Sequence, residues 1–288
     1  MLARSIQLGG KCGTTASSIP FNGQVPTLAG NSVDHVFSMF DDGTNIRQLT
    51  TVRSIYPSWA PDGKHIVFSK LASTAFVVSI MNADGTGIID LTSPPAECSD
   101  VRPRALGKQV VFIRGGGACA DYGLFLMNVD GTGRILLDGS VSSNSNLAPS
   151  PKGGRVVYTR SDGDIWSRDL GTGGLTNLTK GNGGFNPSLS PSGKQIAFVR
   201  GKSIYVMNDD GTAVSQLTSP PLGFLDDFPQ WSPDGKSIGF TRYEPGEEET
   251  VVVADILVMN ADGTGILNNI TGQSLGADHV AFMSAWAR

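Results

Sequence analysis

One short phrase returns six times along the chain, and its spacing constrains the fold more than any other feature. An apolar segment ends in Met-Asn, a turn of the form x-Asp-Gly-Thr follows, and Leu-Thr usually comes a few residues later. Clear copies begin at Met81, Met127, Met207 and Met259, and weaker ones at Met39 and Arg168. The period of roughly 40 to 50 residues is that of a four-stranded propeller blade and is too long for a leucine-rich or helical repeat.

A second phrase, Trp-Ser-Pro-Asp-Gly-Lys, lies ahead of the first one in most repeats. Complete copies begin at Trp59 and Trp231, degraded copies at Ser150 and Ser190, and a shortened one at Ala105. Proline presets φ to about −65°, aspartate binds its own backbone, and glycine adopts the positive φ that closes a hairpin. Each phrase is therefore expected to be a tight turn between two antiparallel strands.

The segments that follow these turns, such as 65–68, 109–113 and 195–199, are continuously apolar or alternate in polarity. That pattern is typical of buried or half-buried strands, and no stretch shows sustained helical periodicity. One repeat therefore holds four strands, named a to d in chain order. Strand a ends at the Trp of the second phrase, strand c ends at Met-Asn, and strand d ends at Leu-Thr.

The C-terminus supplies the strand that the first repeat lacks, because the last residues, Phe282–Ala287, match Pro57–Ala60. We predict an all-β, six-bladed β-propeller with four-stranded antiparallel blades, as one domain over residues 1–288 with a partly irregular segment at 1–30. The first blade combines 280–288 with the N-terminal strands up to Thr50, and the others lie near 54–93, 100–139, 145–180, 185–219 and 227–272. A blade shared between the termini leaves no open edge strand.

Charge and hydropathy argue against two classes of partner. The net charge is −4 and the pI is about 5.3, whereas a nucleic-acid-binding protein needs a basic stripe. No apolar run approaches the length of a membrane span. Residues 1–10 lack the apolar core of a signal peptide, so a secreted protein would have lost it before this numbering begins.

Two cysteines lie in loops that should emerge on the same face of the propeller. Cys98 is in the loop from one strand d into the next strand a, and Cys119 is in the b-to-c loop of that next blade. A Cys98–Cys119 disulfide would contribute roughly 3 kcal/mol and indicate an oxidising compartment. Two free thiols are the alternative, because Cys12 makes the number of cysteines odd.

The paired phrases resemble those of TolB-like six-bladed propellers, over nearly the whole chain from Val33 to Trp286. This resemblance implies a binding platform with a protein partner, often in a periplasmic or extracellular location. A closed ring needs no second copy, so we expect a monomer. Periplasmic TolB carries a further α/β domain ahead of its propeller, for which 288 residues leave no room. The residues by which TolB meets its partners are therefore not transferred to this sequence.

Candidate site residues gather on the face that carries the d-to-a and b-to-c loops, where the repeats differ most. Polar residues near strand a are expected to converge at the channel mouth: Arg53, Asp100, Asn144, Asn146, Asp226, Asp227 and Asp278. Such a ring of oxygens can hold a hard cation or a cationic ligand, and Asp100, Asp227 and Asp278 are the predicted ligands of a candidate Ca²⁺ site. Alternatively, each aspartate caps its own loop through backbone N–H groups.

Two functions are compatible with this pattern. The first is a non-catalytic scaffold that binds a protein or envelope partner through the loop-rich face, with contacts from loops 222–225 and 244–249. The second is a metal-dependent hydrolase or polysaccharide lyase. It would use the carboxylate ring for Ca²⁺, and it would take residues for binding and proton transfer from Arg53, Tyr56, Tyr243 and His279. The histidines are dispersed along the sequence, which favours the non-catalytic role.

Overall fold

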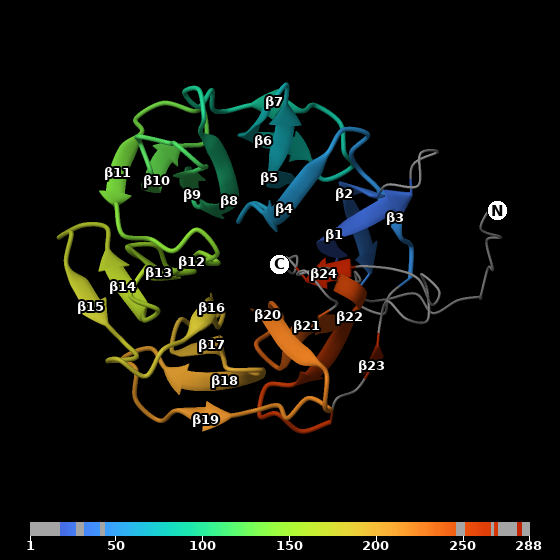
Figure 1. The fold of residues 1–288 in the computed structure, drawn as a ribbon, viewed down its shortest axis with the longest axis vertical. Helices are drawn as coiled ribbons and strands as arrows, with labels where there is room; N and C mark the ends of the chain where they lie inside the picture. The colour runs from blue at the N-terminus through green and yellow to red at the C-terminus, as the bar shows by residue number, and fades with distance from the viewer. Residues whose placement is uncertain are drawn as a thin grey trace.

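The computed structural model describes residues 18–26, 32–40, 44–245, 251–265, 268–269 and 281–283. Within them, 24 strands form six four-stranded antiparallel sheets around a central axis (Figure 1). Strand a of each sheet lies innermost and strand d outermost. The predicted six-bladed propeller is confirmed. Over the same residues, no helix has the length and apolar character needed to cross a membrane.

The blades follow one another around the ring in chain order. The first blade consists of β24 (Ala281–Met283), β1 (Ser18–Pro26), β2 (Ser32–Phe40) and β3 (Arg47–Gln48). The second blade consists of β4 (Ser54–Trp59), β5 (His65–Ala72), β6 (Ala75–Asn82) and β7 (Ile89–Asp90). The third consists of β8 (Ser99–Leu106), β9 (Gln109–Gly115), β10 (Gly123–Asn128) and β11 (Ile135–Asp138). The fourth blade consists of β12 (Ala148–Pro149), β13 (Arg155–Thr159), β14 (Ile165–Asp169) and β15 (Leu175–Asn177). The fifth consists of β16 (Phe185–Leu189), β17 (Gln195–Arg200), β18 (Ser203–Asn208) and β19 (Ser215–Gln216). The sixth consists of β20 (Leu225–Trp231), β21 (Ser237–Pro245), β22 (Val251–Asn260) and β23 (Asn268–Asn269).

The Asp-Gly-Thr turn is held by side chains that fold back on the local backbone. In the second blade, Asp84 Oδ1 accepts hydrogen bonds from the backbone N–H of Thr86 at 2.9 Å and from its hydroxyl at 2.6 Å. Asn82 Nδ2 donates to Thr86 Oγ1 at 3.0 Å. The same three bonds recur in the turns that begin at Asn128, Asn208 and Asn260. The bonds explain why Asn, Asp and Thr recur while the residue between Asn and Asp varies.

The Leu-Thr phrase and the turn glycine meet across the boundary between blades. A Cβ at Gly85, where φ is +89°, would lie 2.9 Å from the carbonyl oxygen of Leu49, just after β3 of the preceding blade. Only glycine permits so close an approach at a positive φ. Thr50 Oγ1 accepts from the backbone N–H of Val36 at 3.0 Å and so continues the pairing of β2 beyond β3. The glycine–leucine contact is repeated by Gly131 with Leu91, Gly211 with Leu178 and Gly263 with Leu217.

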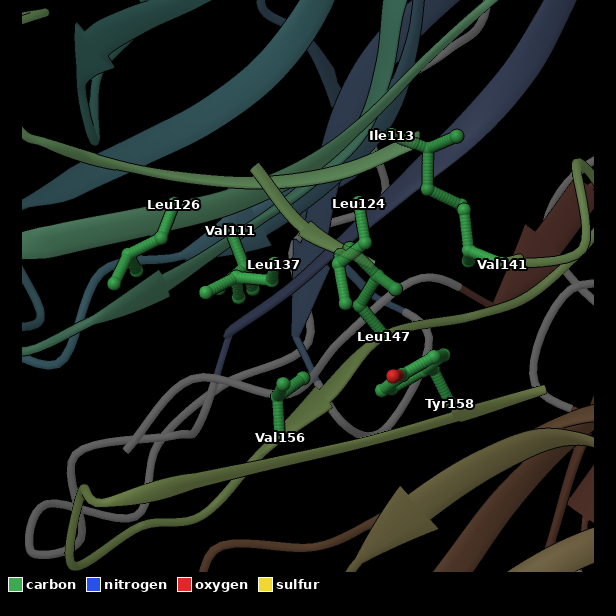
Figure 2. Close-up of a cluster of buried hydrophobic side chains, with 9 residues drawn as sticks. All are labelled: Val111, Ile113, Leu124, Leu126, Leu137, Val141, Leu147, Val156 and Tyr158. Carbon is green, nitrogen blue, oxygen red and sulfur yellow. The ribbon is translucent and has the colours of Figure 1, made fainter. Parts of the chain in front are cut away.

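The hydrophobic core of the described residues is divided into six clusters, and each lies between two neighbouring blades. Figure 2 shows the cluster between the third and fourth blades, where Val111 and Leu124 face Val156 and Tyr158. These four side chains are fully buried. Each blade therefore buries its apolar side chains only because its neighbour covers them.

The ring is closed by pairing between the two ends of the chain. β24 runs antiparallel to β1, with Met283 opposite Phe21 and Ala281 opposite Gly23. The C-terminal strand is therefore strand a of the first blade, as the sequence predicted. Trp286, which was predicted to pack like Trp59, lies outside the described residues.

Deleting residues 279–288 is expected to leave an insoluble or molten chain. The deletion removes β24 and exposes an edge of β1, a loss well beyond the roughly 1–3 kcal/mol of an ordinary substitution. The total stability of a domain is only about 5–15 kcal/mol. Near-UV circular dichroism and thermal melting measure the effect, with a chain lacking only residues 287–288 as the control. A folded longer truncation with an unchanged Tm would contradict this role of β24.

Candidate functional site

Strand a of four blades carries the same irregularity close to the axis. In β4, β8, β16 and β20 the pairing with strand b shifts by a bulge, for example between Val101 and Arg104. A residue inside each bulge has a φ between 51° and 56°: Tyr56, Arg102, Asn186 and Phe228. Non-glycine residues rarely adopt a positive φ, and bulges re-aim side chains. The recurrence at one position shows that the inner wall is built to present these four residues.

Side chains of these inner strands connect neighbouring blades. The backbone N–H of Tyr56 donates to Oδ1 of Asn22 on β1 at 2.9 Å. The guanidinium carbon of Arg102 lies 4.2 Å from the centre of the Tyr56 ring, which is a cation–π contact between the second and third blades. Arg104 Nη2 donates to Oδ1 of Asn146 at 3.3 Å and so joins the third blade to the chain that enters the fourth.

The contacts continue through the fifth and sixth blades. The backbone N–H of Asn146 donates to Oδ1 of Asn186 at 3.1 Å, and Asn186 Nδ2 donates to Oδ1 of Asp227 at 2.6 Å. Phe228 packs against the cluster of buried side chains that includes Phe21 of the first blade. We call this set the inner belt: Asn22, Tyr56, Arg102, Arg104, Asn146, Asn186, Asp227 and Phe228. It links all six blades near the axis.

Two aspartates that were predicted at the mouth are held by arginines of the adjoining strand b. Both oxygens of Asp100 accept hydrogen bonds from Arg114, at 2.7 and 2.8 Å, and both side chains are buried. Asp226 binds Arg242 in the same way, at 2.6 and 2.8 Å. Each pair lies directly across the pairing of strands a and b. These carboxylates are therefore paired within their own blades, in place of the free oxygen ring that the sequence predicted.

The other predicted residues are placed differently. Arg53 pairs with Asp34 at 3.2 Å, with half of its side chain exposed. Asn146 and Asp227 belong to the inner belt, and Asp278 lies outside the described residues. Across the part of the chain that the structure describes, no group of three or more His, Cys, Asp or Glu side chains is placed to hold a metal ion.

Asp227 is a buried carboxylate of the inner belt, and 8 % of it is exposed. Burial raises its pKa, although hydrogen bonds from Asn186 and from the backbone N–H of Phe228, and the charge of Arg102, act in the opposite direction. Its charged form is thus less favourable here than in water.

A cavity of about 550 Å³ opens beside the inner belt. The inner strands line it with Arg102, Phe185, Asn186, Asp227 and Phe228, and the fourth blade lines it with Ser142, Asn144, Thr159, Arg160, Ser161 and Gly163 from the end of β13 and the adjoining loops. These loops belong to the d-to-a and b-to-c class, so the cavity lies on the face predicted to carry function. Its volume falls within the range of about 300–1,000 Å³ that is usual for ligand pockets.

A second cavity of about 550 Å³ lies between the opposite-face turns of the second, third and fourth blades, beside the shortened turn at Gly107. Turn residues such as Pro61 and Pro151 dominate its lining. No buried side-chain nitrogen or oxygen without a partner lies in that lining, among the residues that the structure describes. We therefore place the candidate site at the channel mouth.

The sequence predictions missed Arg102, Asn186 and Phe228 as site residues. A signal was present, because a proline follows the bulge residue in each of the four blades, in the pairs Tyr56-Pro57, Arg102-Pro103, Asn186-Pro187 and Phe228-Pro229. Each pair stands directly ahead of the Pro-Asp-Gly turn or its degraded copy. The repeated proline therefore identifies the four bulge residues of the inner strands in the amino-acid sequence itself.

A disulfide joins two loops on the cavity face. Cys98 and Cys119 are bonded, which ties the loop entering β8 to the loop between β9 and β10. Gly116 allows the two loops to meet, since a Cβ there would lie 2.5 Å from the carbonyl oxygen of Glu97.

Replacing Cys98 and Cys119 together by serine is expected to lower the free energy of unfolding by roughly 3 kcal/mol, because the bridge joins residues 21 positions apart. Urea denaturation with and without reductant measures the effect. Reductant should shift the midpoint of the wild-type chain and leave that of the double variant unchanged. A wild-type midpoint that does not move after verified cleavage of the bridge would contradict the expectation.

Asp100→Asn is expected to destabilise the fold by about 3–5 kcal/mol, because it leaves the buried Arg114 without its counter-charge. The double change Asp100→Leu with Arg114→Met should lie closer to wild type. Asp34→Asn is the matched control, since its partner Arg53 is half exposed and such a pair contributes about 0–1 kcal/mol. Equal losses in Asp100→Asn and Asp34→Asn, measured by urea denaturation, would show that burial of the pair is unimportant.

No family model matches the chain. It is 34 % identical over 94 residues to the uncharacterized peptidase YuxL of Bacillus subtilis, which is 31 % of this chain and 14 % of that protein. It is 35 % identical over 86 residues to the uncharacterized protein Atu1656 of Agrobacterium fabrum, which is 28 % of this chain and 29 % of that protein. The chain thus spans less than a third of the length of either relative.

Among solved structures, TolB from Acinetobacter baumannii matches with a TM-score of 0.71 and 18 % identity, over 94 % of this chain and 66 % of that one. The fold is that of a TolB-like six-bladed propeller. A putative TolB from Agrobacterium tumefaciens matches this TolB-like propeller with a TM-score of 0.65 and 19 % identity, over 93 % of this chain and 98 % of that one. An oligogalacturonate lyase in complex with manganese matches at 0.54 and 13 % identity, over 88 % and 73 % of the two chains. Such likeness shows the fold alone, so function must be argued from the site.

Proposed function

We propose that this TolB-like propeller is a non-catalytic binding protein that receives a protein partner at the channel mouth. The observation that carries the proposal is the cavity beside the inner belt, which is formed jointly by inner strands of three blades and by loops of the fourth. Its walls combine two arginines, a carboxylate, amides and aromatic rings, which is the mixed chemistry that specific recognition requires.

The two faces of the ring differ in whether their polar side chains are already used in local hydrogen bonds. On the opposite face, the Asp-Gly-Thr turns use their polar side chains on one another, as Asp84 and Thr86 do. On the cavity face, the loops differ from blade to blade, and Phe185 is 38 % exposed at the rim. The cavity face is therefore better suited to the specific recognition of one partner.

The disulfide supports a periplasmic or extracellular location, because such bonds persist in oxidising compartments. Closure of the ring by β24 supports a monomer, since the pairing covers the edge of β1 that a second copy would otherwise reach. The alternative of a metal-dependent hydrolase or lyase gains no support from Asp100, whose two oxygens are engaged by Arg114.

Site-specific photo-crosslinking in the producing cells tests the proposal. A photoreactive phenylalanine analogue at Phe185, on the cavity face, is expected to trap one discrete protein partner. The same analogue at Lys194, on the opposite-face turn of the same blade, is the matched control and should trap none. Both positions are exposed, so accessibility does not distinguish them. Equal products at both positions, or none at Phe185 and at further rim positions such as Ser161, would refute the proposed face.

A further inference from the structure

Two arginines of the inner belt are buried with no carboxylate at salt-bridge distance among the described residues. Arg102 is 7 % exposed and Arg104 is 6 % exposed. Other arginines at the inner ends of the blades are neutralised, Arg114 by Asp100 and Arg242 by Asp226. Within the described residues, no ion pair joins Arg102 or Arg104 to an acidic side chain. A buried cation without a counter-ion is costly, so this exception calls for a physical explanation.

Arg102 also has unused hydrogen-bonding capacity. Its Nη1 is buried and has no hydrogen-bond partner. The Tyr56 ring covers the guanidinium at 4.2 Å, but stacking occupies its face and leaves the N–H groups at its edge free. Arg104 differs, because it donates to the carbonyl oxygen of Pro103 and to Asn146. Arg102 is thus the member of the pair with an unsatisfied hydrogen-bond donor, and it also lines the cavity.

The charges around Arg102 do not cancel. Burial, and then the like charge of Arg102, lower the pKa of Arg104 to about 10, which shows that the two cations lie close enough to repel each other. The charge of Arg102 also acts on Asp227, but burial of that carboxylate prevails and raises its pKa. Arg102 therefore lies close to one like charge, that of Arg104, and to one carboxylate, Asp227, whose charged form burial disfavours.

We propose that the channel-mouth cavity is a binding site for an oxyanion, a carboxylate or phosphate group, held by the free edge of Arg102. A guanidinium matches both groups because its N–H donors form a planar fork. Ser142, Asn144 and Ser161 line the same cavity and can supply O–H and N–H donors to the remaining oxygens. The site goes beyond the proposed function, since it holds whether the oxyanion belongs to a free small molecule or to an acidic group of the partner.

Inorganic phosphate is a direct probe, titrated against the full chain at constant ionic strength with chloride as the balancing anion. We expect a saturable rise in Tm and a matching isothermal titration curve, because a ligand that binds only the folded state stabilises it by mass action. Arg102→Gln is expected to weaken phosphate binding by about tenfold or more, as loss of a charge-assisted contact requires. Arg53→Gln is the matched control and should bind phosphate as wild type does. It removes an equal charge from a half-exposed arginine that is already paired with Asp34.

Asn144→Asp keeps the test decisive if Arg102→Gln fails to fold. Asn144 is an exposed residue of the cavity wall, so the change preserves its shape and adds a negative charge. We expect weaker phosphate binding with an unchanged circular dichroism spectrum. Binding that stays at the wild-type level in Asn144→Asp, or a phosphate effect that does not saturate in the wild-type chain, would overturn the proposal.

Two further measurements distinguish the sources of the oxyanion. Native mass spectrometry of protein purified without phosphate should show a retained small anion if the ligand is a free molecule. If the oxyanion is carried by the partner, phosphate and Asn144→Asp should each suppress the crosslink at Phe185. A crosslink that persists under both conditions, with no retained small anion, would leave the partner proposal standing and overturn the oxyanion site.

Discussion

The antiparallel pairing of β24 with β1 is the contact on which the remaining structure depends, because no blade of this ring has a core of its own. Each hydrophobic cluster is shared by two neighbours, as Val111 and Val156 show at one boundary. Opening one boundary would therefore expose two apolar faces at once, and the cost would not be confined to the blade that moved. Stability in such a ring is a property of its boundaries, which resemble the interfaces between units of a repeat protein.

The inner belt adds polar contacts to that apolar framework and gives the centre of the ring its chemistry. Hydrogen bonds such as Asn146 to Asn186 cross from one blade to the next at the narrowest part of the fold. The carboxylates of Asp100 and Asp226 instead bind across strands within a blade, where they fix the ends of strands a and b. The polar residues near the axis thus fall into two groups, one that binds across strands within a blade and one, the inner belt, that joins neighbouring blades and partly lines the cavity. Of these two, the inner belt contains a buried donor without a hydrogen-bond partner on the arginine that lines the cavity, Nη1 of Arg102.

The fold was predictable because its information is local and repeated. The bonds that close the Asp84–Thr86 turn lie within a few residues, so a short motif specifies them, and six copies define the period. The site was less predictable, because its chemistry depends on strand register and on contacts between distant residues. Asp100 and Arg114 are 14 residues apart, and Asn146 and Asn186 are 40 apart. The sequence alone does not tell whether an aspartate near the channel mouth is free or bound to an arginine. For Asp100, the pairing of β8 with β9 decides this, because it places Arg114 directly opposite.

The contact of Gly85 with Leu49 runs in one direction around the ring, since the glycine of one blade meets the leucine of the blade before it. This head-to-tail contact recurs at four boundaries between described blades. A head-to-tail interface leaves one unmatched surface at each end until the last unit reaches the first. This contact could be repeated for any number of blades, so it does not determine how many blades the ring contains. That number is determined where β24 completes the first blade, because a strand already paired with β1 leaves no place for another unit to be added.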